Sequence, residues 1–327
     1  MILVLSQESY ETSTDMVQDW IEYLGGHATR LNGEDLTRGE PFAVRLGREH
    51  DEVRLSVDGR VLSGATVGAV WRRRWHQMQG LGPLPGTTPA VRQLAQRHLA
   101  AELHAVSQSV FALMDEVPWL SRPLAVNKVR ALRLARRAGL EIPETLVTNS
   151  RAELLTFIDA HDGVITKCAS DGEMFPDDQD RTWALYTSVV TREDALALPE
   201  AFFPSLVQAQ VEKSCELRVF YLDGECWPMA IFSQADPQTA VDFRVYNHVR
   251  PNRTVPYRLP AEVEAAIGRF MAAVGLETGS LDLIRTPEGR HVFLEVNPVG
   301  QFSMVGEPCN YPLFRRVAEY LMRAETA

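Results

Sequence analysis

Two carboxylates and an amide occupy matched positions in one predicted β-hairpin near the carboxyl end of the chain. Two apolar stretches flank a Pro-Glu-Gly turn sequence at residues 287–289. If residues 288 and 289 form a two-residue turn, opposing residue numbers share one sum, and Asp282 then lies directly across from Glu295. Asn297 follows two residues after Glu295, so its side chain shares that face of the strand.

This cluster could bind a metal ion, because two like charges that face each other on a sheet repel. The neighbouring residues are mainly apolar, which raises the free energy of an unpaired carboxylate. Carboxylate and amide oxygens are hard ligands that suit Mg²⁺ at nucleotide phosphates, and they do not suit Zn²⁺. The sequence therefore predicts a magnesium site at Asp282, Glu295 and Asn297. The alternative is a solvated edge of alternating polar residues.

Two lysines fit the role of phosphate ligands. Lys128 lies near the start of a helix predicted over residues 126–138, where the helix dipole also attracts anions. Lys167 ends a short apolar strand at residues 163–167. Taken singly, each is more typical of a surface lysine, so the prediction depends on their occurrence together with the carboxylates.

The composition narrows the classes of function. The chain has 327 residues, 45% of them hydrophobic, which is typical of a globular protein with more than one core. Its formal net charge of −10 argues against broad contact with nucleic acid or an anionic membrane, since both require a basic face. No apolar run approaches the roughly 18 residues of a membrane span, and the short apolar start lacks a basic leader. We therefore expect a cytoplasmic protein with no nucleic-acid or membrane partner.

The elements that must position these residues fall into three predicted parts. The chain opens as strand, helix and strand, which is typical of a parallel α/β layer, and prolines mark a boundary near residue 120. A strand-rich middle follows, and the last part holds two hairpins and two helices. We predict a mixed α/β chain (α+β lobes) with domains at residues 1–120, 121–205 and 206–327.

The order and spacing of several motifs across about residues 120–300 resemble those of the ATP-grasp ligases. These motifs are Lys128, Lys167, Gln208-Ala209-Gln210-Val211, Glu216-Leu217-Arg218, and Asp282 with Glu295-Val296-Asn297-Pro298. Further motifs look like the graspetide synthetases, which are peptide maturases that build side-chain ester and amide crosslinks, and like their grasp-with-spasm branch. They are residues 2–6 with Ser13-Thr14-Asp15, Trp71-Arg72-Arg73-Arg74, residues 297–302, and the tail at residues 301–311. The resemblance then covers nearly the whole chain.

The resemblance implies an ATP-grasp fold with an N-terminal Rossmann-like pre-ATP-grasp domain, and ATP and Mg²⁺ as cofactors. The implied nucleotide contacts are Lys128 and Lys167 at the phosphates, the backbone of Gln208, Ala209, Gln210 and Val211 at adenine, and Glu216 at the ribose. The implied metal ligands are Asp282, Glu295 and Asn297, and the implied catalytic residues, which neutralise charge on the transferred phosphoryl group, are Arg218 and Arg244. A structural salt bridge is the alternative for each arginine.

Two positions depart from the family pattern. Ala209 stands where the adenine strand usually carries an acidic residue, and the loop at residues 169–181 has a single glycine, Gly172. The implied adenine contact therefore rests on the backbone, and a glycine-rich phosphate lid is not expected.

The implied reaction joins two side chains of one ribosomal precursor peptide, which consists of a leader and an acidic core. ATP would phosphorylate a Glu or Asp carboxylate, and a Thr, Ser or Lys side chain would displace the phosphate to form an ester or amide. The resemblance also implies a homodimer. Arg72, Arg73 and Arg74 are candidates for contacts to the acidic core, but they could equally cover the end of a strand.

Two rival functions stay open. The first is an ATP-grasp ligase that adds free amino acids to a peptide or protein. The second is a silent ATP-binding peptide carrier, which the complete predicted set of metal ligands disfavours.

Overall fold

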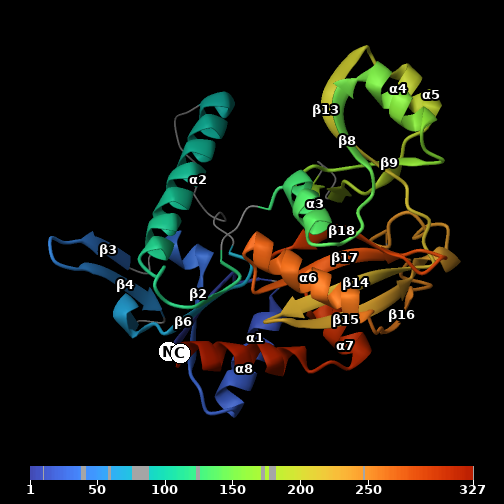
Figure 1. Cartoon of the computed structure of the whole chain (residues 1–327). Helices are drawn as coiled ribbons and strands as arrows, with labels where there is room; N and C mark the ends of the chain where they lie inside the picture. Colours follow the sequence, from blue (N-terminus) through green and yellow to red (C-terminus); the bar gives the residue numbers. More distant parts are fainter. Residues whose placement is uncertain are drawn as a thin grey trace. The chain divides into compact units, whose positions relative to one another are not determined.

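The computed structural model describes residues 1–9, 11–37, 42–57, 60–75, 88–122, 126–170, 174–176, 182–245 and 247–326. The chain divides into two compact units, and each is described by itself. Unit 1 comprises Met1–Leu124 and Pro312–Ala327, and unit 2 comprises Ala125–Tyr311. Figure 1 colours the chain along its sequence and labels its elements.

A four-stranded parallel sheet forms the centre of unit 1. Its order is β2-β1-β6-β7, and the strands are Ile2–Ser6 (β1), Ala28–Asn32 (β2), Ala69–Arg72 (β6) and Trp119–Leu120 (β7). Every residue of β1 is buried, as expected for a parallel strand that is covered on both faces. The predicted opening is confirmed, because α1 (Thr12–Tyr23) connects β1 to β2.

Helices and a small second sheet complete unit 1. An antiparallel sheet consists of β3 (Phe42–Leu46), β4 (Asp51–Val57) and β5 (Arg60–Ser63), and the short 3-10 helices are Gly33–Thr37 and Gly64–Thr66. The end of α2 (Pro89–Ala112) adds Val110 and Phe111 to the core. The C-terminal helix α8 (Leu313–Glu325) packs against α1, and the amino-terminal ammonium lies 2.6 Å from the carboxylate of Glu325. The last helix of the chain therefore belongs with the first residues.

The first sheet of unit 2 is antiparallel and carries helices on one face. Its order is β12-β9-β13-β8, and the strands are Thr145–Ser150 (β8), Val164–Lys167 (β9), Ser188–Val189 (β12) and Ala201–Ala209 (β13). Helices α4 (Arg151–Asp159) and α5 (Arg192–Ala197) cover the face that holds Val164 and Val207. Because side chains alternate along a strand, Lys167 and Gln208 lie on the face without helices. A hairpin of β10 (Met174–Pro176) and β11 (Thr182–Ala184) lies between β9 and β12 in the sequence.

The second sheet of unit 2 is also antiparallel and has five strands. Its order is β16-β15-β14-β17-β18, and the strands are Cys215–Leu222 (β14), Glu225–Phe232 (β15), Arg253–Pro256 (β16), Thr278–Arg285 (β17) and His291–Asn297 (β18). Helices α3 (Lys128–Arg137) and α6 (Ala261–Val274) cover the face that holds Leu217, Leu281 and Leu283. The opposite face therefore presents Arg218 and Asp282. A short helix, α7 (Ser303–Cys309), follows β18.

Local sequence explains two of the turns in unit 2. Asp223 and Gly224 both have positive φ, at 47° and 87°, as the two-residue turn between β14 and β15 requires. Gly139, with φ of 95°, follows Ala138 at the end of α3, a left-handed position that favours glycine.

The predicted fold class is confirmed, since a parallel α/β layer is combined with antiparallel lobes. The division into residues 1–120, 121–205 and 206–327 stays a prediction. The structure keeps residues 125–311 in one unit and groups residues 312–327 with the first part of the chain. None of the helices described is both long and apolar enough to cross a lipid bilayer.

Candidate nucleotide and metal site

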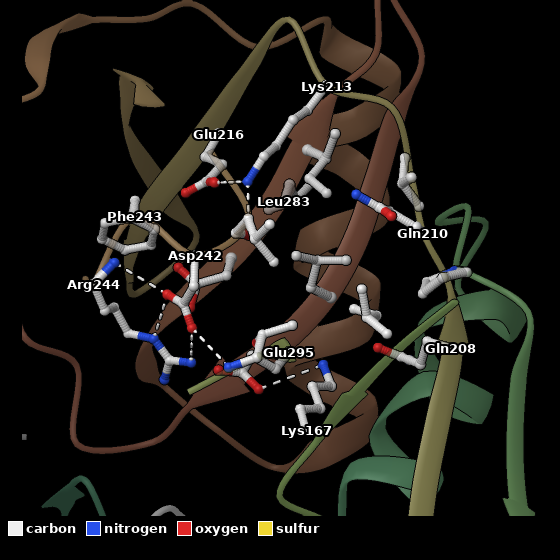
Figure 2. A pocket seen from close by; sticks show the side chains of 18 of the residues that line it. Lys167, Gln208, Gln210, Lys213, Glu216, Asp242, Phe243, Arg244, Leu283 and Glu295 are labelled. Carbon is white, nitrogen blue, oxygen red and sulfur yellow. Dashed lines mark hydrogen bonds and ion pairs between the residues drawn. The ribbon is translucent and has the colours of Figure 1, made fainter. Parts of the chain in front are cut away.

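The faces of the two unit 2 sheets that carry no helices line a shared cavity of about 1000 Å³, counting its open mouth. All seven predicted nucleotide contacts lie in its wall: Lys128, Lys167, Gln208, Ala209, Gln210, Val211 and Glu216. Arg244, Asp282 and Glu295 line it as well, whereas Arg218 and Asn297 do not. Figure 2 shows the charged side chains converging from both sheets.

The β17–β18 hairpin places Asp282 opposite Glu295, as predicted. The turn differs from the prediction, because it has three residues: Thr286 N donates to Arg290 O, and Gly289 has φ of 90°. A type I turn that ends in a left-handed residue favours glycine there. The register shifts back between Asp282 and Leu283, which makes Leu294 an extra residue on β18. The predicted pairing is thus confirmed, but the predicted two-residue turn is wrong.

Arg218 holds Asp282 from the neighbouring strand β14. The two residues are directly paired, and one guanidinium nitrogen of Arg218 lies 2.8 and 2.7 Å from the two carboxylate oxygens. Burial raises the pKa of Asp282 above its usual value, although Arg218 acts to lower it. The Nε of Arg218 is buried and has no hydrogen-bond partner among the described residues.

Glu295 is held by the two predicted phosphate lysines. Its Oε2 lies 3.3 Å from Nζ of Lys128 and 3.7 Å from Nζ of Lys167. Burial alone would raise the pKa of Glu295, but the charges of Lys167, Lys128 and Arg244 outweigh it and hold this pKa below its usual value. Burial also lowers the pKa of Lys167, an effect that Glu295 opposes. Lys128 is fixed further by donating to the carbonyl of Cys168 at 2.9 Å.

Asn297 lies two residues beyond Glu295 on β18, opposite Ser280. Its side-chain oxygen accepts a hydrogen bond of 3.1 Å from the backbone amide of Val299. The residue is half-buried and does not line the cavity, so its role as a metal ligand stays a prediction.

The end of β13 forms one rim of the cavity. The amides of Ala209 and Gln210 donate to the carbonyls of Glu144 and Gly163, each at 2.9 Å. The amide of Val211 donates to no other described residue, so it can bind a ligand. Gln208 is fully buried, and no described residue bonds to its side-chain oxygen, although its Nε2 donates to Thr145 at 2.9 Å.

Glu216 lines the cavity from β14, in the other sheet of unit 2. Its Oε1 accepts hydrogen bonds from Lys213 and from Ser233, the latter at 3.1 Å, while its Oε2 is buried without a partner in the structure. Burial raises the pKa of Glu216, and Lys213 opposes this effect. Lys213 also lines the cavity and donates to the carbonyl of Val241 at 3.0 Å. Lys213 was not predicted from the sequence, where its one signal is its position three residues before Glu216.

Arg244 enters the cavity from the long loop between β15 and β16. Its guanidinium is paired with Asp242, at 2.9 Å from Nε and 2.6 Å from a terminal nitrogen. This pairing and the nearby Glu295 and Asp282 raise the pKa of Arg244 despite its burial. Asp242 was also missed, and the Asp-Phe-Arg tripeptide was its signal.

The charged side chains in the cavity wall suit a site that binds a metal ion together with an anion. The lining carries four cationic and four carboxylate side chains: Lys128, Lys167, Lys213 and Arg244, with Glu216, Asp242, Asp282 and Glu295. Among the described residues, no group of three or more His, Cys, Asp or Glu side chains is arranged to hold a metal. A metal at Asp282 and Glu295 would thus complete its shell with other oxygens, as Mg²⁺ does with phosphates. The donor set fits Mg²⁺ bound together with a polyphosphate.

The three arginines at the end of β6 in unit 1 do not share one role. Glu11 is buried and accepts from the Nε atoms of Arg73 and Arg74 at 3.1 and 3.0 Å. Arg73 is 2% exposed, so this pair closes the end of the strand. Arg72 is half-buried, and its Nε has no partner in the part of the chain that the structure describes. Gly172 lies outside the described residues.

Comparison with known proteins relates this geometry to a family. Residues 1–127 match the family model of the MvdD pre-ATP grasp domain. Macrocyclase MdnC from Microcystis aeruginosa MRC, solved with its precursor peptide MdnA, is 26% identical and aligns over 98% of this chain and 99% of its own, with a TM-score of 0.81. The sequence of no curated protein matches the chain.

Two further solved structures share the fold. The Chryseobacterium gregarium RiPP-associated ATP-grasp ligase, in complex with ADP and a leader and core peptide, is 22% identical over 98% of this chain and 96% of its own, with a TM-score of 0.86. The ATP-grasp ligase PsnB, complexed with a precursor variant, Mg and ADP, is 19% identical over 100% of this chain and 98% of its own, with a TM-score of 0.74. The chain therefore has the fold of the ATP-grasp ligases, and its amino-terminal part is similar to a pre-ATP-grasp domain.

Proposed function

We propose that the protein is an ADP-forming ligase that crosslinks side chains of a ribosomal precursor peptide. It would activate Glu or Asp carboxylates of an acidic core and join them to Thr, Ser or Lys side chains as esters or amides. One observation carries the proposal: the opposed pair Asp282 and Glu295 lies among cations in the same cavity as the predicted nucleotide contacts. MdnC, a macrocyclase solved with its precursor peptide, has this fold at 26% identity.

The nucleotide would bind between the two sheets of unit 2. Adenine would lie at the end of β13, where the free amide of Val211 and the unpaired side-chain oxygen of Gln208 offer a donor and an acceptor. The unpaired Oε2 of Glu216 would accept from a ribose hydroxyl. Lys128 and Lys167 would hold the phosphates, because both ammonium groups already converge on one point beside Glu295.

Asp282, Glu295 and Asn297 would hold Mg²⁺, as predicted from the hairpin. PsnB is complexed with Mg and ADP, which supports the same requirement here. When bound, the ion would neutralise negative charge on the phosphates. Lys128 and Lys167 pair with Glu295 in this structure. When Glu295 binds the ion instead, both lysines would be available to the phosphates.

The reaction needs ATP because a free carboxylate has a poor leaving group and must first be activated. An oxygen of the substrate carboxylate attacks the γ-phosphorus, the bond to the β-γ bridging oxygen breaks, and an acyl phosphate and ADP form. The hydroxyl or amine of the acceptor attacks the acyl carbon, loses its proton, and expels inorganic phosphate. Arg244 would neutralise charge that develops on the transferred group from the cavity wall, whereas Arg218 would act by holding Asp282 in place. Each link removes one water from the peptide.

The rivals differ in their products. A ligase that adds free amino acids would increase the peptide mass, and a silent carrier would bind ATP without forming ADP. The pairing of Asp282 with Glu295 in a cation-rich cavity disfavours the carrier. D-Alanyl-alanine synthetase A from Vibrio cholerae has the same fold at a TM-score of 0.53, so the fold by itself does not select the substrate.

Two further features belong to the proposal. We place the enzyme in the cytoplasm, because its reaction consumes ATP. We also propose a homodimer on the family resemblance, and light scattering coupled to size-exclusion chromatography tests it: a monomer mass at micromolar concentration would exclude a stable dimer.

The decisive experiment incubates the purified protein with ATP, Mg²⁺ and the precursor peptide encoded beside its gene. Peptide mass and ADP release are followed together. The proposal expects whole multiples of water loss with one ADP for each water. A gain in mass would indicate amino-acid addition, and ATP binding without ADP release would indicate the carrier.

A further inference from the structure

Asp242 holds Arg244 in the cavity wall through three hydrogen bonds. Its Oδ1 accepts from the backbone amide and from Nε of Arg244, at 3.0 and 2.9 Å, and its Oδ2 accepts from a terminal guanidinium nitrogen at 2.6 Å. Asp242 is 6% exposed, whereas the side chain of Arg244 is 48% exposed. A bidentate pair fixes both the direction and the plane of a guanidinium. Figure 2 shows the guanidinium of Arg244 bonded to the carboxylate of Asp242, near Glu295.

The same carboxylate also connects the two walls of the cavity. Its Oδ2 accepts a hydrogen bond of 3.1 Å from the backbone amide of Thr187. Thr187 lines the cavity directly before β12, in the sheet that carries Lys167 and Gln208. Asp242 belongs to the loop that leaves the other sheet after β15. One buried side chain thus fixes Arg244 and ties its loop to the opposite wall.

The loop has a separate set of bonds that keep its shape. Thr239 is fully buried, and its hydroxyl lies 2.7 Å from the carbonyl of Ser233 and 3.0 Å from the side-chain oxygen of Asn252. Asp236 accepts from the side chain of Asn247 at 2.7 Å. None of these contacts involves Asp242. The Asp242 carboxylate therefore bonds to Arg244 and Thr187, and the bonds of Thr239 and Asp236 do not depend on it.

A buried carboxylate in this position costs free energy unless it is paired. Burial would raise the pKa of Asp242, but its hydrogen bonds and the charge of Arg244 outweigh it and hold the pKa below its usual value. The group is therefore a charged acceptor at neutral pH. A neutral or shorter side chain at this position would leave Arg244 free to leave the wall.

We propose that Asp242 is a positioning residue of the ligase, which aims Arg244 at the transferred phosphoryl group and joins the two walls around the nucleotide. This inference rests on the proposed function, which assigns the charge-neutralising role to Arg244. Asp242 acts through Arg244 and has no contact with the substrate of its own.

A double-mutant cycle tests this role. Steady-state kinetics would compare the wild type, Asp242→Ala, Arg244→Ala and the double variant, because residues that act as a unit give non-additive losses. We expect Asp242→Ala and Arg244→Ala each to lower kcat by about 10²-fold, with a smaller change in the KM for ATP. The double variant should be no slower than Arg244→Ala. Asp242→Asn, which keeps one acceptor oxygen, should retain more activity than Asp242→Ala.

The matched control is Asp236→Asn, in the same loop but outside the cavity. Its kcat should equal that of the wild type, and all variants should have similar unfolding temperatures. A wild-type kcat in Asp242→Ala, or losses that multiply in the double variant, would overturn the positioning role.

A nucleotide-binding measurement that needs no peptide tests this inference separately from the proposed function. Calorimetric titration with AMPPNP and Mg²⁺ can be run on the same four proteins. Weaker binding of the same size in Asp242→Ala, Arg244→Ala and the double variant supports the positioning role, and additive losses refute it. If the wild type binds AMPPNP but does not modify the precursor peptide, the proposed substrate is wrong while the cycle still tests Asp242.

Discussion

Asp282 and Glu295 face each other across β17 and β18 even though the turn that joins these strands is one residue longer than the pairing rule assumes. The extra residue Leu294 on β18 takes up the difference. A bulge of this kind turns side chains toward a site, and Leu294 and Glu295 both line the cavity. The geometry of the predicted metal site therefore depends on two irregular features that compensate each other.

The metal requirement is the first prediction. Asp282→Asn and Glu295→Gln each remove a charged oxygen donor, so the Mg²⁺ concentration for half-maximal ADP release should rise by about tenfold or more. EDTA should abolish ADP release by the wild type, and added Mg²⁺ should restore it. Glu288→Gln, at the exposed turn of the same hairpin, is the control and should need no more Mg²⁺ than the wild type. Equal Mg²⁺ dependence in all four proteins would place the metal elsewhere.

The phosphate lysines give the second prediction. Lys128→Ala and Lys167→Ala should each weaken ADP binding in the presence of Mg²⁺ by roughly 10- to 100-fold, because each removes one charge-assisted hydrogen bond of about 1.5–3 kcal/mol. Isothermal titration calorimetry measures the dissociation constants. Arg133→Ala, an exposed cation on α3, controls for the loss of one positive charge. The prediction fails if Arg133→Ala weakens binding as much as the lysine variants do.

Nucleotide binding should depend on pH through Glu216. Burial raises its pKa above the usual 4.5, so the charged form is lost at a higher pH than for an exposed glutamate. Nucleotide binding needs the charged acceptor, and it should therefore weaken as the pH falls through this raised pKa. ADP titrations between about pH 5 and 8 test this, because the acid limb should disappear in Glu216→Gln, whose affinity is low at every pH. An unchanged acid limb in that variant would assign the titration to another group.

The buried ion pair of unit 1 gives a prediction about stability. Glu11→Gln would remove the charged carboxylate from its buried pair with Arg73, which should lower the free energy of unfolding by about 3–5 kcal/mol. Asp15→Asn is the matched control, since the pair of Asp15 with Arg30 is exposed on the carboxylate side and should contribute about 1 kcal/mol or less. Urea unfolding followed by circular dichroism measures both. Similar losses in the two variants would mean that the Glu11 pair is screened like a surface pair.

The sequence by itself determined the chemistry and the local order of the site. The pairing of Asp282 with Glu295 follows from local rules, because strand alternation and a short turn restrict which side chains can share a face. The end of α3 at Gly139 was also predictable, since a left-handed position favours glycine. The family motifs indicated the remaining nucleotide contacts, and the cavity contains all of them.

Tertiary structure decided what depends on contacts between distant segments. The hydrogen bond between Asp242 and Thr187 spans 55 positions, and no periodicity of either segment indicates it. The place of α8 against α1 likewise joins the two ends of the chain, because each helix buries an apolar face that either could have buried elsewhere. Local rules act over a few residues, whereas packing selects among distant partners by shape and charge. Most of the predicted site residues therefore share one cavity, as the sequence suggested, whereas the contacts of Asp242 and of α8 were decided by the fold.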